Sequence, residues 1–293
     1  MNKATCKINS GPVFISALSC IISFFLLQSL ACWLPPEFNL LSSRGAGKFA
    51  FMTLVIMHLV FFTALVPSSF FATFITTNFS FFRTRSWYKD FFIFFNLFAT
   101  LHSLFLLTGV AAGYAIFTPM INYSWATLTC KLVIGLVATF LLAWSEEMIF
   151  RGTLYRYLSL SLSPFKSMLI TSAIFALAHN LTAPWLLMAT DYKLGLGLFL
   201  LGLLLNLIFV ITNKLYCSMG AHAGLVFIKV CLRRAPIVTL LPLNMLPWWL
   251  HTDLRQSFFV HLIFFLCIIT LCVHYKDRIF SSNHDAAKAP PKG

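Results

Sequence analysis

The sequence has few charged residues, and this scarcity excludes most classes of soluble protein. Only 10% of the residues are charged and 59% are apolar, with a mean hydropathy of +0.86. An average soluble domain is about 25% charged and roughly 45–50% apolar. Acidic residues are especially rare, with eight among 293 positions. The composition therefore indicates an integral membrane protein, and no stretch is polar enough to form a separate soluble domain.

Paired metal-binding cysteines are also missing. The eight cysteines include no Cys-x-x-Cys pair and mostly lie within apolar runs, so we expect buried thiols rather than a disulfide framework or a zinc cluster. The net charge of +13 comes from Lys and Arg residues that are scattered through short loops. Contact with the lipid bilayer and its anionic headgroups explains this distribution better than nucleic-acid binding does. We therefore expect no nucleic-acid partner.

Long apolar runs predict an all-α fold with about eight transmembrane helices. A spanning helix needs about 20 residues, and these runs lack the alternation of a membrane barrel. The predicted spans are residues 12–34, 49–71, 91–117, 132–157, 167–189, 194–212, 215–232 and 257–275. Three prolines and two tryptophans interrupt residues 235–251, which we interpret as a re-entrant or interfacial stretch and not as a ninth span.

The spans divide the chain into four parts. Residues 1–132 hold the N-terminal helices, 133–232 a core of spans four to seven, 233–275 the interfacial segment with the last span, and 276–293 a disordered tail. Both termini are predicted to be cytoplasmic, because this orientation places most Lys and Arg residues inside. Arg233, Arg234 and Arg255 are the exception. The small size and compact loops favour the bacterial inner membrane.

Two of the three glutamates stand side by side near the end of the fourth predicted span, as Glu146 and Glu147. A carboxylate in hydrocarbon is costly unless it is paired or hydrated, so such acids are candidate functional residues. Glu147 and Arg151 have the i,i+4 order that favours a salt bridge. Glu146 lies roughly 100° around the helix and has no such partner, so it is free for chemistry. The alternative is an ion pair at the membrane surface beside a hydrated glutamate.

Two histidines occur in nearby predicted spans. His179 is predicted near the middle of span 167–189, one turn after Phe175, and His222 lies among small residues that permit close helix packing. A single histidine in such a helix is more often a packing residue, which is how we interpret His102 and His261. For His179 and His222, the presence of Glu146 in a neighbouring span changes this interpretation, because one hydrated cavity could hold the Glu146 carboxylate and both imidazoles.

These residues match three motifs of a known family. Glu146, Glu147 and Arg151 fit Glu-Glu-x-x-x-Arg, and Phe175 with His179 fits Phe-x-x-x-His. The third motif, a histidine followed four residues later by Asn or Asp, is matched only by its histidine, His222. Residues 133–232 thus resemble the CAAX proteases and bacteriocin-processing enzymes, the Abi group of glutamate-type intramembrane proteases. The departure is Val226, which stands where the family has its Asn or Asp; Asn180, Asn206 or Lys229 are possible substitutes.

The resemblance implies a membrane-embedded peptidase that needs no cofactor and acts on a membrane-associated peptide, such as a CAAX tail or a leader peptide. Glu146 and His179 would activate water, His222 would polarise the carbonyl, and Glu147 with Arg151 would hold the helix end. Three alternatives remain open. One glutamate and two histidines could bind zinc, the same groups could relay protons in a transporter, or Val226 could mark a catalytically impaired scaffold.

Overall fold

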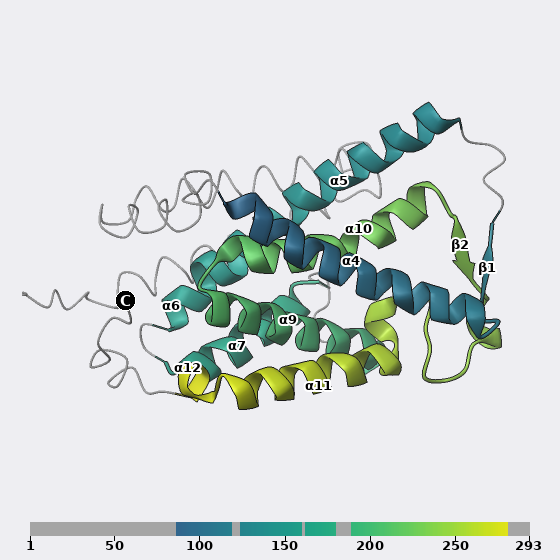
Figure 1. Ribbon diagram of the computed structural model, residues 1–293. Helices are drawn as coiled ribbons and strands as arrows, with labels where there is room; N and C mark the ends of the chain where they lie inside the picture. The colour runs from purple at the N-terminus through teal and green to yellow at the C-terminus, as the bar shows by residue number, and fades with distance from the viewer. Residues whose placement is uncertain (1–85, 119–123, 160–161, 180–188, 281–293) are drawn as a thin grey trace, which may run out of the picture.

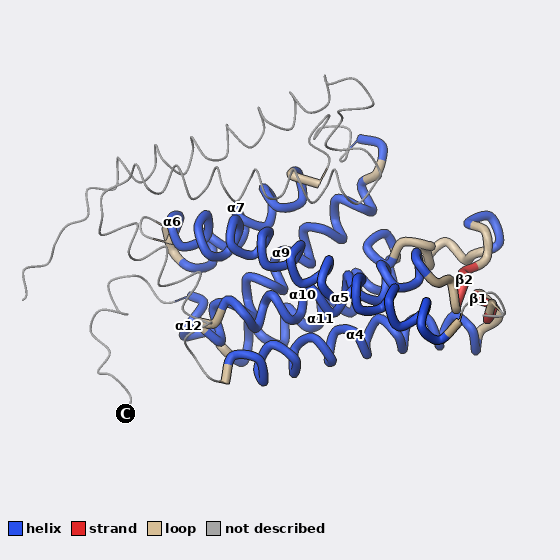
Figure 2. Tube along the Cα trace, turned by 90° about the horizontal axis from the view of Figure 1, so that it is seen from above, coloured by secondary structure: helices blue, strands red, loops and turns tan. Residues whose placement is uncertain are grey.

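The computed structural model describes residues 86–118, 124–159, 162–179 and 189–280. These residues form a helical bundle with a two-stranded sheet at one end (Figure 1), and Figure 2 shows the same bundle from above. The predicted all-α class is confirmed.

Among the described residues, four helices are long and apolar enough to cross a membrane: α4 (Trp87–Ala111), the continuous helix Trp125–Leu158, α9 (Tyr192–Thr212) and α10 (Leu215–Arg234). The second of these consists of α5 (Trp125–Glu147), the π-helical η2 (Met148–Tyr155) and α6 (Arg156–Leu158). Two shorter apolar helices are α7 (Pro164–Leu177) and α11 (Phe258–His274), and α11 is followed by α12 (Lys276–Phe280). Eight spans are not confirmed, because the predicted spans 12–34 and 49–71 lie outside the described residues.

Helix α10 lies between α4 and α5 and packs against both. Its glycines face the α4 backbone: a Cβ at Gly220 would collide with the carbonyl oxygen of Phe91, and a Cβ at Gly224 with that of Phe95. Only glycine lets the two helices approach this closely. The predicted packing role of the small residues around His222 is therefore confirmed.

Helix α9 is the most buried of the four candidate spans and packs against α7 and α11. The Asp191 side chain caps its first turn by accepting a hydrogen bond from Leu194 N, at 3.2 Å. At its other end Asn213 has the left-handed conformation, with φ of 53°, which turns the chain directly into α10. The following Lys214 pairs with Asp90 at 2.7 Å and ties this turn to the start of α4.

Two predicted helix ends are wrong. The predicted span 91–117 ends at Ala111 in α4, and β1 (Ala115–Phe117) then pairs antiparallel with β2 (Val238–Leu240). The predicted span 167–189 stops at Leu177. In both places the apolar composition continues past the end of the helix, so hydropathy could not mark where it stops.

The segment between α10 and α11 contains β2 and two 3₁₀ turns, η3 (Leu243–Met245) and η4 (Leu254–Gln256). It holds no helix long enough to cross a membrane. The prediction that residues 235–251 are not a ninth span is confirmed, whereas the sheet that this segment forms with β1 was not predicted.

Candidate active site

Glu146 and Glu147 are the last two residues of α5, and the helix continues without a break into η2. Within η2, Thr153 donates its hydroxyl hydrogen to the carbonyl oxygen of Met148, at 2.9 Å. A π turn holds an extra residue compared with an α turn and is frequent at functional sites. The irregular segment thus begins directly after the two glutamates and contains Arg151.

Arg151 and Glu147 form an ion pair in the protein interior. Nη1 donates to Glu147 Oε1 at 2.9 Å, Nη2 donates to the carbonyl oxygen of Gly202 on α9 at 2.9 Å, and neither charged side chain is exposed. The predicted i,i+4 pair is confirmed, and its complete burial inside the protein argues against a solvent-exposed pair. The hydrogen bond to Gly202 joins η2 to α9, and removing one partner of a buried ion pair typically costs about 3–5 kcal/mol.

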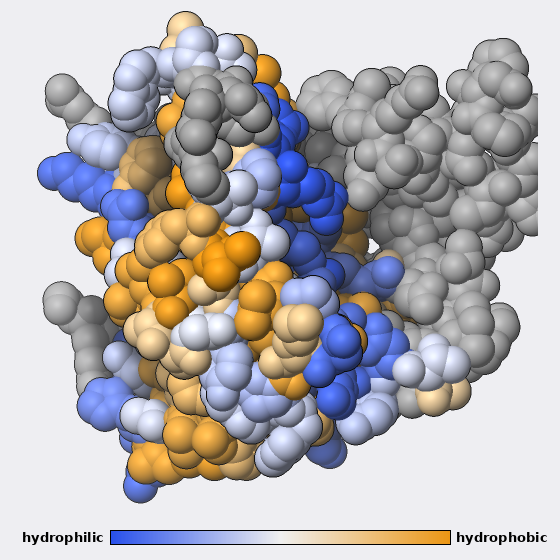
Figure 3. All heavy atoms as spheres, turned by 90° about the vertical axis from the view of Figure 1, so that its right-hand side faces the viewer, coloured by the Kyte–Doolittle hydropathy of each residue, from blue (hydrophilic) through white to orange (hydrophobic). Residues whose placement is uncertain are grey.

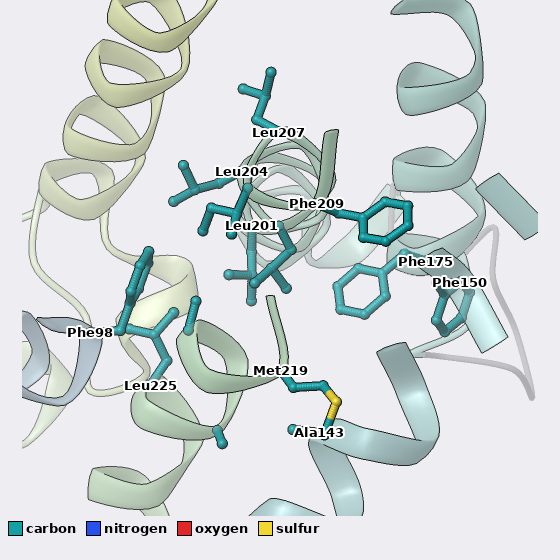
Figure 4. Packing of buried hydrophobic residues seen from close by; sticks show 14 of the residues in the cluster. Phe98, Ala143, Phe150, Phe175, Leu201, Leu204, Leu207, Phe209, Met219 and Leu225 are labelled. Atoms are coloured by element: carbon teal, nitrogen blue, oxygen red, sulfur yellow. The ribbon is translucent and has the colours of Figure 1, made fainter. Parts of the chain in front are cut away.

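The Phe175 ring provides an apolar wall beside the ion pair. The guanidinium carbon of Arg151 lies 4.8 Å from the ring centroid, and the Phe150 ring meets Phe175 edge to face at 5.1 Å. Figure 4 shows Phe150 and Phe175 next to each other, with the Met219 side chain of α10 reaching toward Ala143 of α5. All four apolar residues are buried, so α5, η2, α7 and α10 meet in a closely packed apolar region.

His222 is positioned by the second glutamate. Its Nδ1 lies 3.0 Å from Glu147 Oε1, and the ring is almost fully buried. A carboxylate can only accept a hydrogen bond, so Nδ1 carries a hydrogen, while Nε2 lies 3.7 Å from Glu146 Oε2. The sequence interpretation gave Glu147 only Arg151 as a partner. It missed His222 because two residues 75 positions apart carry no spacing signal.

His179 is the second imidazole beside Glu146. It lies in the turn just after α7, which corrects the prediction that it sits in the middle of a helix. Its Nδ1 is 2.8 Å from the carbonyl oxygen of Phe175, and its Nε2 is 3.9 Å from Glu146 Oε2. Because a carbonyl oxygen only accepts, Nδ1 donates the hydrogen here as well. The turn leaves the side chain 24% exposed.

One carboxylate oxygen and two imidazole nitrogens therefore converge. In the neutral imidazoles each Nε2 is an acceptor, as is Glu146 Oε2, and separations of 3.7 and 3.9 Å are too long for direct hydrogen bonds. Such spacing between acceptors fits a bridging water that donates to two of them. The Glu146 side chain is 21% exposed whereas that of Glu147 is fully buried. The arrangement can hold and activate one water molecule.

The position four residues after His222 is occupied by Val226 on α10, which has no polar side-chain atom. Asn206 is held by α7, since its Nδ2 donates to Ser172 Oγ at 2.9 Å and to the carbonyl oxygen of Met168 at 3.3 Å. Lys229 forms an ion pair with Asp253 at 2.6 Å. Both possible substitutes are thus engaged elsewhere, and Asn180 lies outside the described residues. Within the described ranges, no three His, Cys, Asp or Glu side chains are arranged as metal ligands.

Comparison with known proteins agrees with the motif pattern. Residues 125–228 match the family model of type II CAAX prenyl endopeptidases, Rce1-like. The matched segment starts at the first residue of α5 and extends into α10, so it contains Glu146, Glu147, Arg151, His179 and His222. No curated protein and no solved structure matches significantly. The resemblance to the CAAX proteases that was inferred from the sequence is confirmed.

Proposed function

From the match of residues 125–228 to the type II CAAX prenyl endopeptidases, we propose that this chain is an intramembrane endopeptidase that hydrolyses a membrane-associated peptide. The observation that carries the proposal is the convergence of Glu146 Oε2 with the Nε2 atoms of His179 and His222, at 3.9 and 3.7 Å. These three groups are the catalytic residues, and Glu147 with Arg151 positions them. The substrate class is a prenylated CAAX tail or a similar peptide at the membrane.

The first chemical step is attack by water on the scissile carbonyl carbon. A water molecule bound between Glu146 and His179 gives up one proton to the carboxylate as its oxygen forms the new C–O bond. General-base assistance of this kind contributes about 10²–10⁴-fold in rate. His179 accepts the other hydrogen bond of the water and aims its lone pair. The product of this step is a tetrahedral oxyanion, without a covalent bond to the protein.

His222 stabilises that oxyanion. Nδ1 donates its hydrogen to Glu147, so Nε2 can donate to the oxyanion only when the ring has taken up one more proton and is an imidazolium. In this scheme that proton comes from solvent before the attack and returns to solvent on product release, so it cancels in the net reaction. The arrangement resembles the carboxylate that orients an imidazole in hydrolytic triads. When the C–N bond breaks, the proton held by Glu146 passes to the leaving amine. The net reaction consumes one water molecule and releases one acid and one amine.

We also propose residues 133–232 as the catalytic core, with the preceding and following helices as its support in the membrane. Exposed apolar side chains cover much of α4 and α11, which suits helices that face lipid. The bacterial inner membrane as location and the cytoplasmic placement of both termini remain part of this proposal.

A second candidate is a catalytically impaired scaffold that binds a membrane peptide without cutting it. Val226 favours this alternative, because losing one oxyanion donor typically lowers the rate by about 10²–10³-fold. A scaffold would retain peptide binding but release no product, whereas an impaired enzyme would release product slowly.

The test is cleavage of an S-prenylated CAAX peptide by the purified protein in detergent, with products identified by mass. We expect product from the wild type and from Asp277→Asn, a carboxylate-to-amide control at an exposed position of α12. Glu146→Gln should release none above background, and a chelator should not slow the wild type. A Glu146→Gln protein that cleaves as fast as wild type would contradict the proposal; inhibition by chelator, reversed by zinc, would favour the metal alternative.

A further inference from the structure

A pocket lies at the end of the bundle that carries the β1–β2 sheet. There α4, the last turns of α10 and the chain between α10 and α11 enclose about 390 Å³, and small-molecule sites typically measure about 300–1,000 Å³. None of the three proposed catalytic residues lines this pocket. Figure 3 looks onto this end of the molecule, where hydrophilic and hydrophobic residues lie side by side. The pocket is therefore a candidate ligand site distinct from the catalytic residues.

The carboxylate of the pocket is shared by two cations. Lys229 donates to Asp253 Oδ2 at 2.6 Å, and Arg255 donates to both oxygens of the same carboxylate, at 2.7 and 3.1 Å. Burial raises the pKa of Asp253, but the hydrogen bonds from Arg255 and Lys229 outweigh it and hold this pKa well below its ordinary value. Asp253 is thus an anion at neutral pH, and its single charge is exceeded by those of its two partners.

Arg233 adds a third positive charge to this pocket. Its side chain is exposed, and it makes no ion pair with any of the described residues. It lies near enough to Lys229 for the two positive charges to act on each other, and an anion placed between them would remove this repulsion. A guanidinium binds carboxylate or phosphate through two parallel N–H donors. The pocket is therefore charged to receive an anion from outside the protein.

Apolar side chains lie beside the charged groups. Phe105 and Leu232 line the pocket itself, as does Val238 of β2. Phe117 pairs with Val238 across the sheet, so both side chains lie on the same face of it, and Phe117 is 59% exposed. Trp248, in the chain between α10 and α11, is 75% exposed. An amphiphile with an anionic head and a hydrocarbon tail matches both parts of this surface.

The pocket lies where two candidate membrane spans end. Helices α4 and α10 both contribute its walls from their last turns, and they end at Ala111 and Arg234. The ends of spanning helices lie at the level of the lipid headgroups, and basic pockets between such helices bind anionic headgroups. Arg233 and Arg255 are also two of the arginines that did not fit the predicted distribution of charge across the membrane. A bound anionic headgroup gives these two charges a local role.

We propose that this pocket binds the headgroup phosphate of one anionic phospholipid from the surrounding bilayer, with the acyl chains against the apolar surface beside it. Arg233 pairs with the phosphate diester, Lys229 adds a second positive charge, and Asp253 keeps Lys229 and Arg255 in place. A zwitterionic lipid carries its own cation next to the phosphate, and the positive charge of the pocket repels that cation. The site therefore selects headgroups with a net negative charge, and it does so whether or not the protein is a peptidase.

The test titrates the purified full chain in neutral detergent with phosphatidylglycerol or phosphatidylcholine of identical acyl chains, and native mass spectrometry measures the fraction of protein that carries one lipid. Because hydrogen bonds to charged groups are worth a factor of about ten to a hundred, phosphatidylglycerol should bind more tightly by that factor. Arg233→Gln should remove most of this preference and leave phosphatidylcholine binding unchanged. Arg234→Gln is the matched control, since it removes the same charge but Arg234 does not line the pocket.

A second arm of the experiment separates a lipid from a soluble phosphate. Glycerol 3-phosphate carries the phosphate without acyl chains, and it should not displace phosphatidylglycerol even in large molar excess. Displacement would overturn the lipid as the ligand and indicate a site for a soluble phosphate. Equal binding of the two lipids, or an equal loss of phosphatidylglycerol binding in both arginine variants, would overturn the pocket. An apparent Tm equal to wild type in both variants would show that unfolding does not cause the loss.

Discussion

The two adjacent glutamates differ in almost every physical respect. Glu147 is fully buried and its Oε1 accepts hydrogen bonds from both Arg151 and His222, each within about 3 Å. Glu146 is partly exposed, and neither imidazole is close enough to bond its Oε2 directly. One carboxylate is thus a fixed counter-ion that orients its neighbours, whereas the other is available to a water molecule. The sequence predicted this division from the position of Arg151 alone, but not the part that His222 plays in it.

Glu147→Gln should destabilise the protein strongly. The amide leaves the buried Arg151 without a counter-charge, and such losses cost about 3–5 kcal/mol. We expect a marked drop in the apparent Tm in detergent, while Glu146→Gln unfolds near the wild-type temperature. The double variant Glu147→Gln/Arg151→Met should recover part of the loss, because it removes the unpaired cation. If Glu147→Gln unfolds like wild type, the ion pair does not have the structural role assigned to it.

Val226→Asn should increase the cleavage rate. It introduces a hydrogen-bond donor one turn after His222, where the related motif carries Asn or Asp, and one oxyanion donor is worth about 10²–10³-fold in rate. We expect part of that factor to appear in kcat with little change in KM, and Val226→Ala should show no gain. A decrease or no change in kcat for Val226→Asn, in a protein of normal stability, would mean that the side chain at 226 does not reach the oxyanion.

The stability difference between the wild type and Asp253→Asn should depend on pH. Its pKa is lowered in the folded protein, so the carboxylate stabilises the fold above its unfolded pKa, which is about 3.9. This stabilisation is lost as the pH falls from the unfolded-state pKa of Asp253 toward its lower pKa in the folded protein. The apparent Tm of Asp253→Asn should therefore lie below wild type at pH 7, and the gap should narrow below about pH 4. A gap that stays constant down to pH 3 would argue against ionised Asp253 as its cause.

At the scale of elements, hydropathy predicted where helices exist better than where they end. The boundaries of α9, α10 and α11 agree with the predicted spans within a few residues, because charged or turn-forming residues interrupt the apolar runs there. Past Leu177 and Ala111 the sequence stays apolar, so hydropathy marks neither helix end; only Gly113, with φ of 75°, is a local stop signal after α4. The end of α7 matters most, since it places His179 in a turn with its Nε2 near Glu146.

The close contact between α4 and α10 is open to a direct test. Gly220→Ala would place a Cβ against the carbonyl oxygen of Phe91, and overpacking of this kind costs typically about 1–3 kcal/mol. We expect a lower apparent Tm and slower cleavage, because α10 carries His222. Gly135→Ala on α5 is the control: its Cβ would be 3.6 Å from the nearest atom, Cys231 Sγ. Equal effects of the two substitutions would show that lost glycine flexibility, not helix approach, is responsible.

At the scale of the whole molecule, composition was sufficient to predict an all-α membrane protein, and the motif residues Glu146, His179 and His222 lie close together in the fold. What could not be predicted is the contact between distant segments. The sheet joins β1 to β2 across more than 100 residues, and Asp253 meets Lys229 from a separate loop. Both contacts depend on how the chain folds back after α10. No periodicity in residues 235–257 predicts this path.

Membrane orientation can be measured with two single-cysteine variants, made after the eight native cysteines are replaced by serine, with the new cysteine on either side of α11. Met245 and Lys276 are both exposed, and 17 helical residues separate their segments. If both termini are cytoplasmic, an impermeant thiol reagent added to intact cells should label Met245→Cys but not Lys276→Cys. The opposite pattern would place the C-terminus outside and reverse the predicted orientation.

The most direct test of a single water shared by Glu146 and His179 is the cleavage rate of Glu146→Gln, His179→Gln and the double variant under single-turnover conditions. Residues that act as one unit have non-additive effects. We predict that each single variant loses at least about a hundredfold in rate and that the double variant is no slower than the slower single. Losses that multiply in the double variant, or a single variant that cleaves at the wild-type rate, would contradict a shared catalytic water.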